Sequence, residues 1–159
     1  MSRRADHLHT LAQTQAALTR LAASLSDEVL DFRPEPDAWS TREILAHLVD
    51  DEMYVMRTRL ERIVKEDHPD LTPHDEKQWY AARNTTRDGR DELLADFALQ
   101  RAASLGIMHM LRDSDWARSG FQPEYGHFSA EGWLDHWVAH DTTHLRQIEA
   151  NLAEYAARG

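Results

Sequence analysis

The chain has 159 residues, of which 42% are apolar and 29% charged, and it contains no cysteine. These values are typical of one globular domain that buries a core without disulfides. The lack of cysteine excludes thiolate metal sites and cysteine nucleophiles. The net charge of −10, with basic residues spread along the chain, argues against nucleic-acid binding. No apolar run is long enough to span a bilayer or to act as a signal peptide, so we expect a cytoplasmic protein.

Amphipathic patterns predict a helix over residues 4–30 and a second helix over residues 40–65. In the first, leucines recur at three-, four- and seven-residue steps, and the pattern ends before Pro34. In the second, Ser40 and Glu43 have the spacing of a capping box, in which each side chain binds a free backbone N–H at the helix start. Trp39 and Ile44 flank this cap at the positions of a hydrophobic staple.

A long polar connection, residues 66–88, follows the second helix. Pro73 at the first helical position predicts a short helix through Tyr80. A third helix is expected over residues 89–112. Residues 113–128 are interpreted as an ordered loop because of their glycines and proline.

Ser129 then caps a fourth helix that ends near residue 157. No segment shows clear period-two alternation. Four long amphipathic helices predict an all-α four-helix bundle in a single domain, residues 1–159, and the long second connection suits a crossover.

Two of the ten histidines, His140 and His144, lie four residues apart on the last predicted helix. Side chains at this spacing share a helix face, so both rings can bind one metal ion. His136 and His140 have the same spacing, and spacing alone favours ordinary surface or core histidines. The segment HDTTH also has the spacing of the zinc-protease helix HExxH. An aspartate replaces the glutamate and no third ligand follows, which argues against a protease.

Two segments together resemble the DinB/YfiT-like family of metalloenzymes, also called the DinB-like four-helix domain. They are residues 33–52, RPEPDAWSTREILAHLVDDE, and residues 140–148, HDTTHLRQI. Their order and separation fit over essentially the whole chain. The resemblance implies an up-down-down-up bundle that binds a divalent metal through His47, His140 and His144.

The resemblance also implies a homodimer that acts on a small molecule. Several members are transferases or isomerases that use a low-molecular-weight thiol such as bacillithiol or mycothiol. The damage-inducible expression that names the family does not imply DNA binding.

Three neutral imidazoles would leave the metal, most simply zinc or nickel, with an open position for water or a thiol. Because the chain has no cysteine, a thiol would have to be a cosubstrate. Carboxylates near the ligands are candidates to orient the rings or act in catalysis, with surface charges as the alternative. These candidates are Asp50, Asp51 and Asp141.

Glu52 and Arg101 fall inside the apolar stripes of their helices, so we expect them to pair within the bundle or face a substrate cleft. A long side chain that reaches solvent is the alternative. Trp133, Tyr125 and His127 are the candidates to line that cleft. The favoured function is a metal-dependent thiol transferase or hydrolase. The alternatives are a non-catalytic metal- or ligand-binding stress protein and a dimeric scaffold with vestigial histidines.

Overall fold

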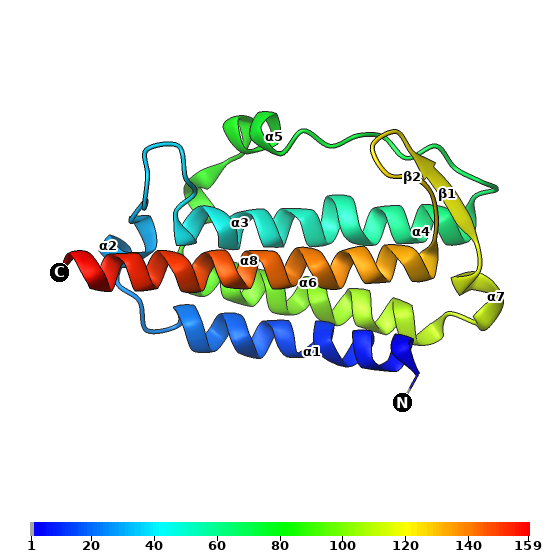
Figure 1. The fold of residues 1–159 in the computed structure, drawn as a ribbon, viewed down its shortest axis with the longest axis horizontal. Helices are drawn as coiled ribbons and strands as arrows, with labels where there is room; N and C mark the ends of the chain where they lie inside the picture. Colours follow the sequence, from blue (N-terminus) through cyan, green and yellow to red (C-terminus); the bar gives the residue numbers. More distant parts are fainter. Residues whose placement is uncertain (1) are drawn as a thin grey trace.

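The computed structural model describes residues 2–159 as a bundle of four long helical rods (Figure 1). The rods are α1 (Arg3–Ala22), the continuous series α3 (Thr41–Asp51), η1 (Glu52–Arg57) and α4 (Thr58–Lys65), then α6 (Arg90–Met110) and α8 (Ala130–Arg158). Within the described residues, no helix is both long and apolar enough to cross a membrane.

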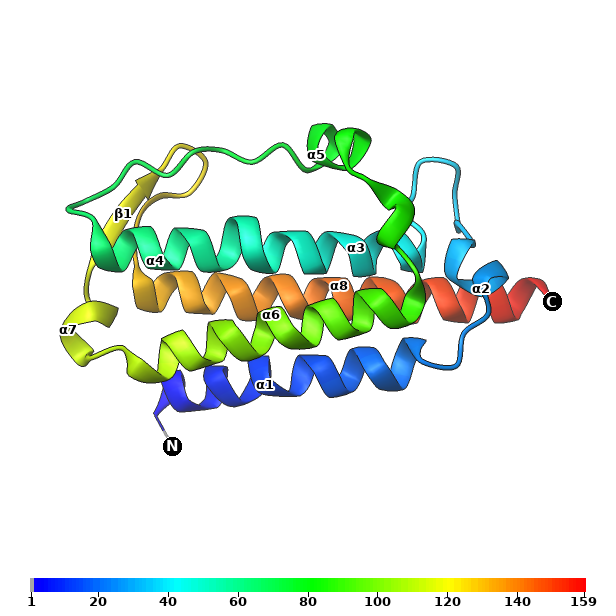
Figure 2. The ribbon, with the colours of Figure 1, turned by 180° about the vertical axis from the view of Figure 1, so that it is seen from behind.

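The rods have an up-down-down-up topology, as expected. Figures 1 and 2 show α1 and α8 running one way and the α3–α4 rod and α6 running the other way. Both α1 and α3 pack against α6 and α8. Because α3 and α6 are parallel, the chain between them must return along the whole bundle, which explains the long connection.

The first predicted helix was too long, because the structure divides residues 4–30 into two helices. Helix α1 ends at Ala22, and α2 (Asp27–Asp31) starts after Ser26, whose hydroxyl accepts a hydrogen bond from the Val29 amide. Leu30 is nevertheless buried in the core. The apolar spacing therefore continued across the break and concealed it.

The second predicted helix has the expected extent and the expected capping box at Ser40 and Glu43. Its middle, however, is the π-helical segment η1, where the Thr58 hydroxyl donates to the Met53 carbonyl at 2.8 Å. A π turn closes with one residue more than an α turn. Residues after η1 are therefore rotated about the helix axis relative to those before it.

The connection contains the predicted short helix, but it starts later than expected. Helix α5 (Glu76–Ala82) is capped by Asp75, which accepts a hydrogen bond from the Gln78 amide, so Pro73 is not at its first position. A single turn, η2 (Thr85–Arg87), follows. Asp50 fixes α5 over α3 because its carboxylate accepts hydrogen bonds from the Trp79 indole at 2.8 Å and from Arg83 at 2.7 Å.

The segment predicted to be a loop contains α7 (Asp113–Trp116) and a hairpin of β1 (Ser119–Gln122) and β2 (Gly126–Ser129). The strands are antiparallel, with Gln122 opposite Gly126. Gly126 has a φ of 75°, the left-handed conformation that closes a three-residue hairpin loop. Strands of four residues are too short to give a clear alternation. Phe121 also bonds to the backbone of residues 69 and 71, so the hairpin holds the long connection in place.

A polar layer divides the apolar core into two halves. Arg101 of α6 donates two hydrogen bonds of 2.8 Å to Glu52 of η1 and one of 2.7 Å to Asp141 of α8. It also donates to the Leu11 carbonyl of α1, and the Thr14 hydroxyl donates to Asp141. The three charged side chains are each 2% exposed. The two charges that were expected to need a partner, Glu52 and Arg101, are partners of each other.

The polar layer predicts a large stability effect for Arg101→Met. The substitution keeps the apolar volume but leaves Glu52 and Asp141 buried without their cation, which typically costs about 3–5 kcal/mol. We expect urea denaturation to show a loss of this size. Arg57→Met is the control, since within residues 2–159 Arg57 forms only a long hydrogen bond of 3.4 Å to the Gln100 carbonyl. Equal stability of the two variants would contradict the role given to the layer.

Candidate metal centre

Three histidines from two rods converge between α3 and α8. The Nε2 atom of His47 lies 3.2 Å from Nε2 of His140 and 3.0 Å from Nε2 of His144. Nitrogen ligands about 2.0–2.1 Å from a tetrahedral metal lie about 3.3 Å apart, so these separations fit one ion. The set His47, His140 and His144 is one of two groups in the described residues that could hold a metal. The other consists of His47, Asp51 and Glu76.

The ring orientations suit metal binding. His144 Nδ1 lies 2.7 Å from the side-chain oxygen of Gln147, one turn along the exposed surface of α8. Because an amide oxygen only accepts, Nδ1 carries the hydrogen and leaves the Nε2 lone pair free for a metal. His140 Nδ1 lies 3.7 Å from Asp141 Oδ1, and both atoms are buried without a hydrogen bond.

Asp51 is the acidic side chain next to the three histidines. Its Oδ2 atom lies 3.5 Å from His47 Nε2 and 3.3 Å from His140 Nε2, and its Oδ1 atom lies 3.6 Å from His74 Nε2. Burial raises the pKa of this carboxyl, but His140, His47 and His74 together hold the pKa below its usual value. Asp51 is therefore ionised at neutral pH.

The charges around the histidines favour a cation. Asp51, Glu52 and Asp141 are three almost fully buried carboxylates, while Arg101 is the only buried guanidinium that contacts any of them in the described chain. Burial lowers the pKa of His47 to about 3 and that of His144 to about 4, so both rings are neutral and able to bind a metal.

His140 has the opposite shift. Burial disfavours its charge, but Asp141 and Asp51 raise its pKa to about 9, so the metal-free ring holds a proton between two carboxylates. A bound divalent ion would replace that proton and balance the remaining negative charge. The donor set and its surroundings thus fit a divalent metal.

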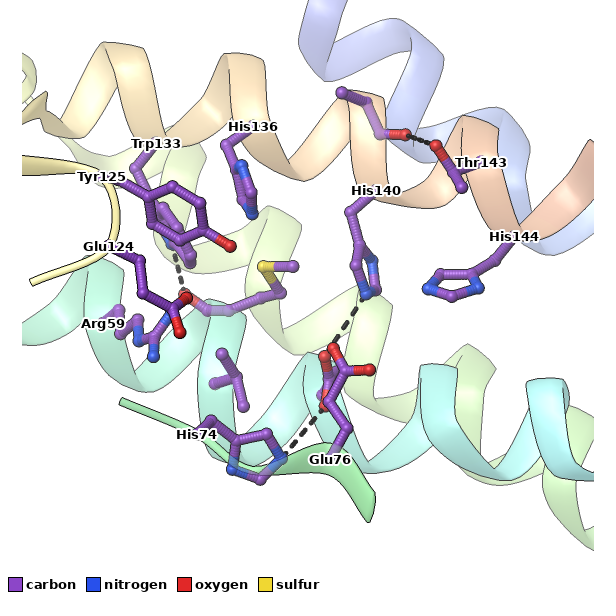
Figure 3. A pocket seen from close by; sticks show the side chains of 14 residues that line it. Arg59, His74, Glu76, Glu124, Tyr125, Trp133, His136, His140, Thr143 and His144 are labelled. Carbon is purple, nitrogen blue, oxygen red and sulfur yellow. Dashed lines mark hydrogen bonds and ion pairs between the residues drawn. The ribbon is translucent and has the colours of Figure 1, made fainter. Parts of the chain in front are cut away.

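A pocket of about 290 Å³ opens beside His140 and His144 (Figure 3). Helix α8 provides one wall with Trp133, His136, His140 and His144, and the α3–α4 rod provides the other. Figure 3 shows His140 and His144 at one end and Arg59, Tyr125 and Trp133 at the other. His74 and Glu76 come from the long connection, and Glu124 and Tyr125 come from the tip of the hairpin.

The structure brings most of the candidate residues to this region, but not all of them. Tyr125 and Trp133 line the pocket that His140 and His144 also line, at its other end. Asp50 points to α5, where it binds Trp79 and Arg83. His127 is exposed on β2 and packs its ring against Phe121.

Asp141, Glu52 and Arg101 form the polar layer behind the site. His136 lies outside the converging group, and its ring is stacked on Trp133 at 4.8 Å. The alternative pairing of His136 with His140 is thus not the one that meets His47.

Sequence reasoning missed several residues of the site. Gln147 was detectable, because it lies three residues after His144 on a helix and so on the same face. Arg59 could not be placed, since the π segment changes the face on which residues after position 57 lie. The remaining residues sit on the connection and the hairpin, whose positions depend on long-range pairing. They are His74, Glu76 and Glu124.

Comparisons with known proteins agree with this architecture. A protein of Oceanobacillus iheyensis is 27% identical over 142 residues, covering 82% of this chain and 75% of its own. YfiT of Bacillus subtilis is 23% identical over 144 residues, covering 89% of this chain and 79% of its own. Both are named, provisionally, as metal-dependent hydrolases.

The solved structure of YfiT from Bacillus subtilis, described as a four-helix bundle of unusual topology, has the same fold. It matches with a TM-score of 0.87 and 21% identity and covers 98% of this chain and 90% of that chain. The family model of the DinB superfamily matches residues 10–148. The chain therefore belongs to the DinB superfamily.

Proposed function

We propose that the protein is a metal-dependent hydrolase of a small substrate, with the metal held by His47, His140 and His144. The observation that carries this proposal is the convergence of three imidazole nitrogens, beside the Asp51 carboxylate, at the wall of a pocket. The provisional names of the two curated relatives support it.

A zinc or nickel ion, when bound there, would supply Lewis acidity that activates water near neutral pH. The protein's own groups would do the rest. Asp51 Oδ2 lies beside Nε2 of His47 and of His140 and is ionised, so it can accept a proton from water and hold it. Nε2 of His74 lies 3.6 Å from the other oxygen of this carboxylate, a distance at which attraction is electrostatic and no hydrogen bond forms.

The far wall of the pocket suits the apolar part of a substrate. Tyr125, Trp133 and His136 form a continuous aromatic surface, with ring centroids 4.9 Å and 4.8 Å apart. A substrate packed on these rings would have its reacting group directed toward His140 and Asp51. Such positioning lowers the entropic cost of the reaction.

The metal assignment is tested by comparing His144→Ala with His136→Ala. His144 belongs to the converging group and His136 does not, although each lies four residues from His140. We expect untagged wild-type protein and His136→Ala to bind one divalent ion per chain. Loss of a residue that only orients a metal ligand typically weakens metal binding roughly tenfold to hundredfold. His144→Ala removes a ligand itself and should weaken binding by more than this. Elemental analysis and calorimetry measure this, and equal metal content in both variants would exclude the site.

Gln147→Leu should weaken the metal without unfolding the protein. The substitution removes the oxygen that holds the hydrogen on His144 Nδ1, and outer partners of this kind contribute about tenfold or more in affinity. The neighbouring Arg146→Leu is the matched control, because Arg146 is also exposed on α8. Calorimetric zinc titration gives both affinities. An unchanged affinity in Gln147→Leu would show that this contact does not set the ring orientation.

Hydrolysis itself is tested with a panel of small esters, amides and lactones, using zinc- and nickel-loaded protein. Asp51→Asn should reduce kcat by about a hundred- to ten-thousand-fold, the usual contribution of a proton acceptor. Asp135→Asn is the control, since Asp135 lies on the same helix as His140 but pairs with Arg3 and His7. If turnover requires an added low-molecular-weight thiol, the reaction is thiol transfer and the proposed hydrolysis is wrong.

A further inference from the structure

The protein buries two arginines whose surroundings differ sharply. Arg101 is 2% exposed and is neutralised by Glu52 and Asp141. Arg59 is 9% exposed, yet it forms no ion pair with any residue of the described chain 2–159. Its guanidinium donates a hydrogen bond of 2.8 Å to the neutral Thr72 carbonyl.

The pKa values reflect this contrast. Burial works against the charge of both guanidinium groups. Asp141 and Glu52 nevertheless raise the pKa of Arg101, whereas burial leaves the pKa of Arg59 below its ordinary value. A buried charge normally has a directly bound partner, but the carboxylates of Asp51 and Glu124 act on Arg59 only from beyond ion-pair distance.

The structure also holds Arg59 in a fixed position at the pocket. Its guanidinium lies over the Trp133 ring, 5.3 Å from the ring centre, and its hydrogen bond to Thr72 anchors it to the long connection. It lines the same pocket as His140 and His144 but lies at the opposite end (Figure 3). Because the guanidinium is planar and carries five donors, it matches a planar oxyanion.

We propose that Arg59 is a specificity-determining residue that binds the carboxylate of a small organic acid, while the group to be cleaved lies at the histidine end. This proposal rests on the proposed hydrolase function and names its substrate class. The pocket of about 290 Å³ is at the small end of the range for ligand sites, roughly 300–1,000 Å³. A compact acid fits that size.

The other charges of the pocket select a monoanion. Asp51, Glu76 and Glu124 line the same space and are all acidic. They would repel every negative charge of a ligand and Arg59 offsets one, so a singly charged carboxylate is favoured over a phosphate or phosphonate dianion. The apolar body of the acid would lie against the aromatic surface of Tyr125, Trp133 and His136.

Benzoate and its neutral isostere benzamide are the probes, with calorimetry of zinc-loaded protein as the measurement. We expect Arg59→Gln to weaken benzoate binding by about tenfold to hundredfold, the contribution of a charge-assisted hydrogen bond, and to leave benzamide unchanged. Benzenephosphonate should bind wild type more weakly than benzoate does. Arg57→Gln removes the same charge two residues away, outside the pocket, and should change nothing.

Arg59→Lys keeps the charge and the apolar stem and should have intermediate affinity. It replaces the glutamine variant in the comparison if that variant does not fold. Benzoate binding that is equal in the Arg59 variants and the Arg57 control would overturn the proposal, and so would an equal loss of benzoate and benzamide.

The same titrations on metal-free protein and on His144→Ala separate this proposal from the proposed hydrolase. The Arg59-dependent preference for benzoate over benzamide should persist in both samples. If the wild type binds no metal but keeps this preference, the proposed hydrolase function is wrong and the proposed carboxylate site is supported. If it binds metal but shows no such preference, only the carboxylate site fails.

Discussion

Arg101 lies where all four rods meet, and its charge must be neutralised there because water cannot reach it. Glu52 and Asp141 satisfy this requirement from two different rods, and Leu11 and Thr14 complete the layer from α1. A charge-assisted network of this kind tolerates little sliding of one helix past another, since each displacement would leave a buried charge unpaired. The register of the bundle is therefore tied to a few atoms.

That register also sets the position of the three candidate metal ligands. Glu52 directly follows Asp51, and Asp141 directly follows His140, so the side chains that hold Arg101 alternate along the chain with those that face the histidine cluster. Glu52, Asp141 and the neighbouring Asp51 are three buried carboxylates, whereas the polar layer contains one guanidinium, that of Arg101. The resulting negative potential favours a cation at the three Nε2 atoms. The charges that stabilise the bundle are thus also the ones that set the electrostatic potential at the candidate metal site.

Local rules in the sequence were sufficient for the four rods, whereas the choice of His47, His140 and His144 rested on the family resemblance, because spacing alone favoured ordinary histidines. The Ser40 capping box and the one-turn spacing of His140 and His144 act within single helices, so they can be recognised without the rest of the fold. The break before Ser26 was missed because Leu30 remains buried beyond it. The hairpin and the π segment were missed because four-residue strands and a single widened turn leave no periodic trace.

These omissions concern one half of the pocket in particular. The histidine end is built on regular helix, where spacing predicts direction. The Arg59 end depends on the rotation introduced by η1, on Gly126, whose left-handed backbone turns Glu124 and Tyr125 toward the pocket, and on backbone bonds between residues 69–71 and Phe121. A shift of the hairpin or the connection would reshape this end while the polar layer kept the histidines in place. The fold therefore separates a pocket end fixed by regular helices from an end whose shape can change through loops alone.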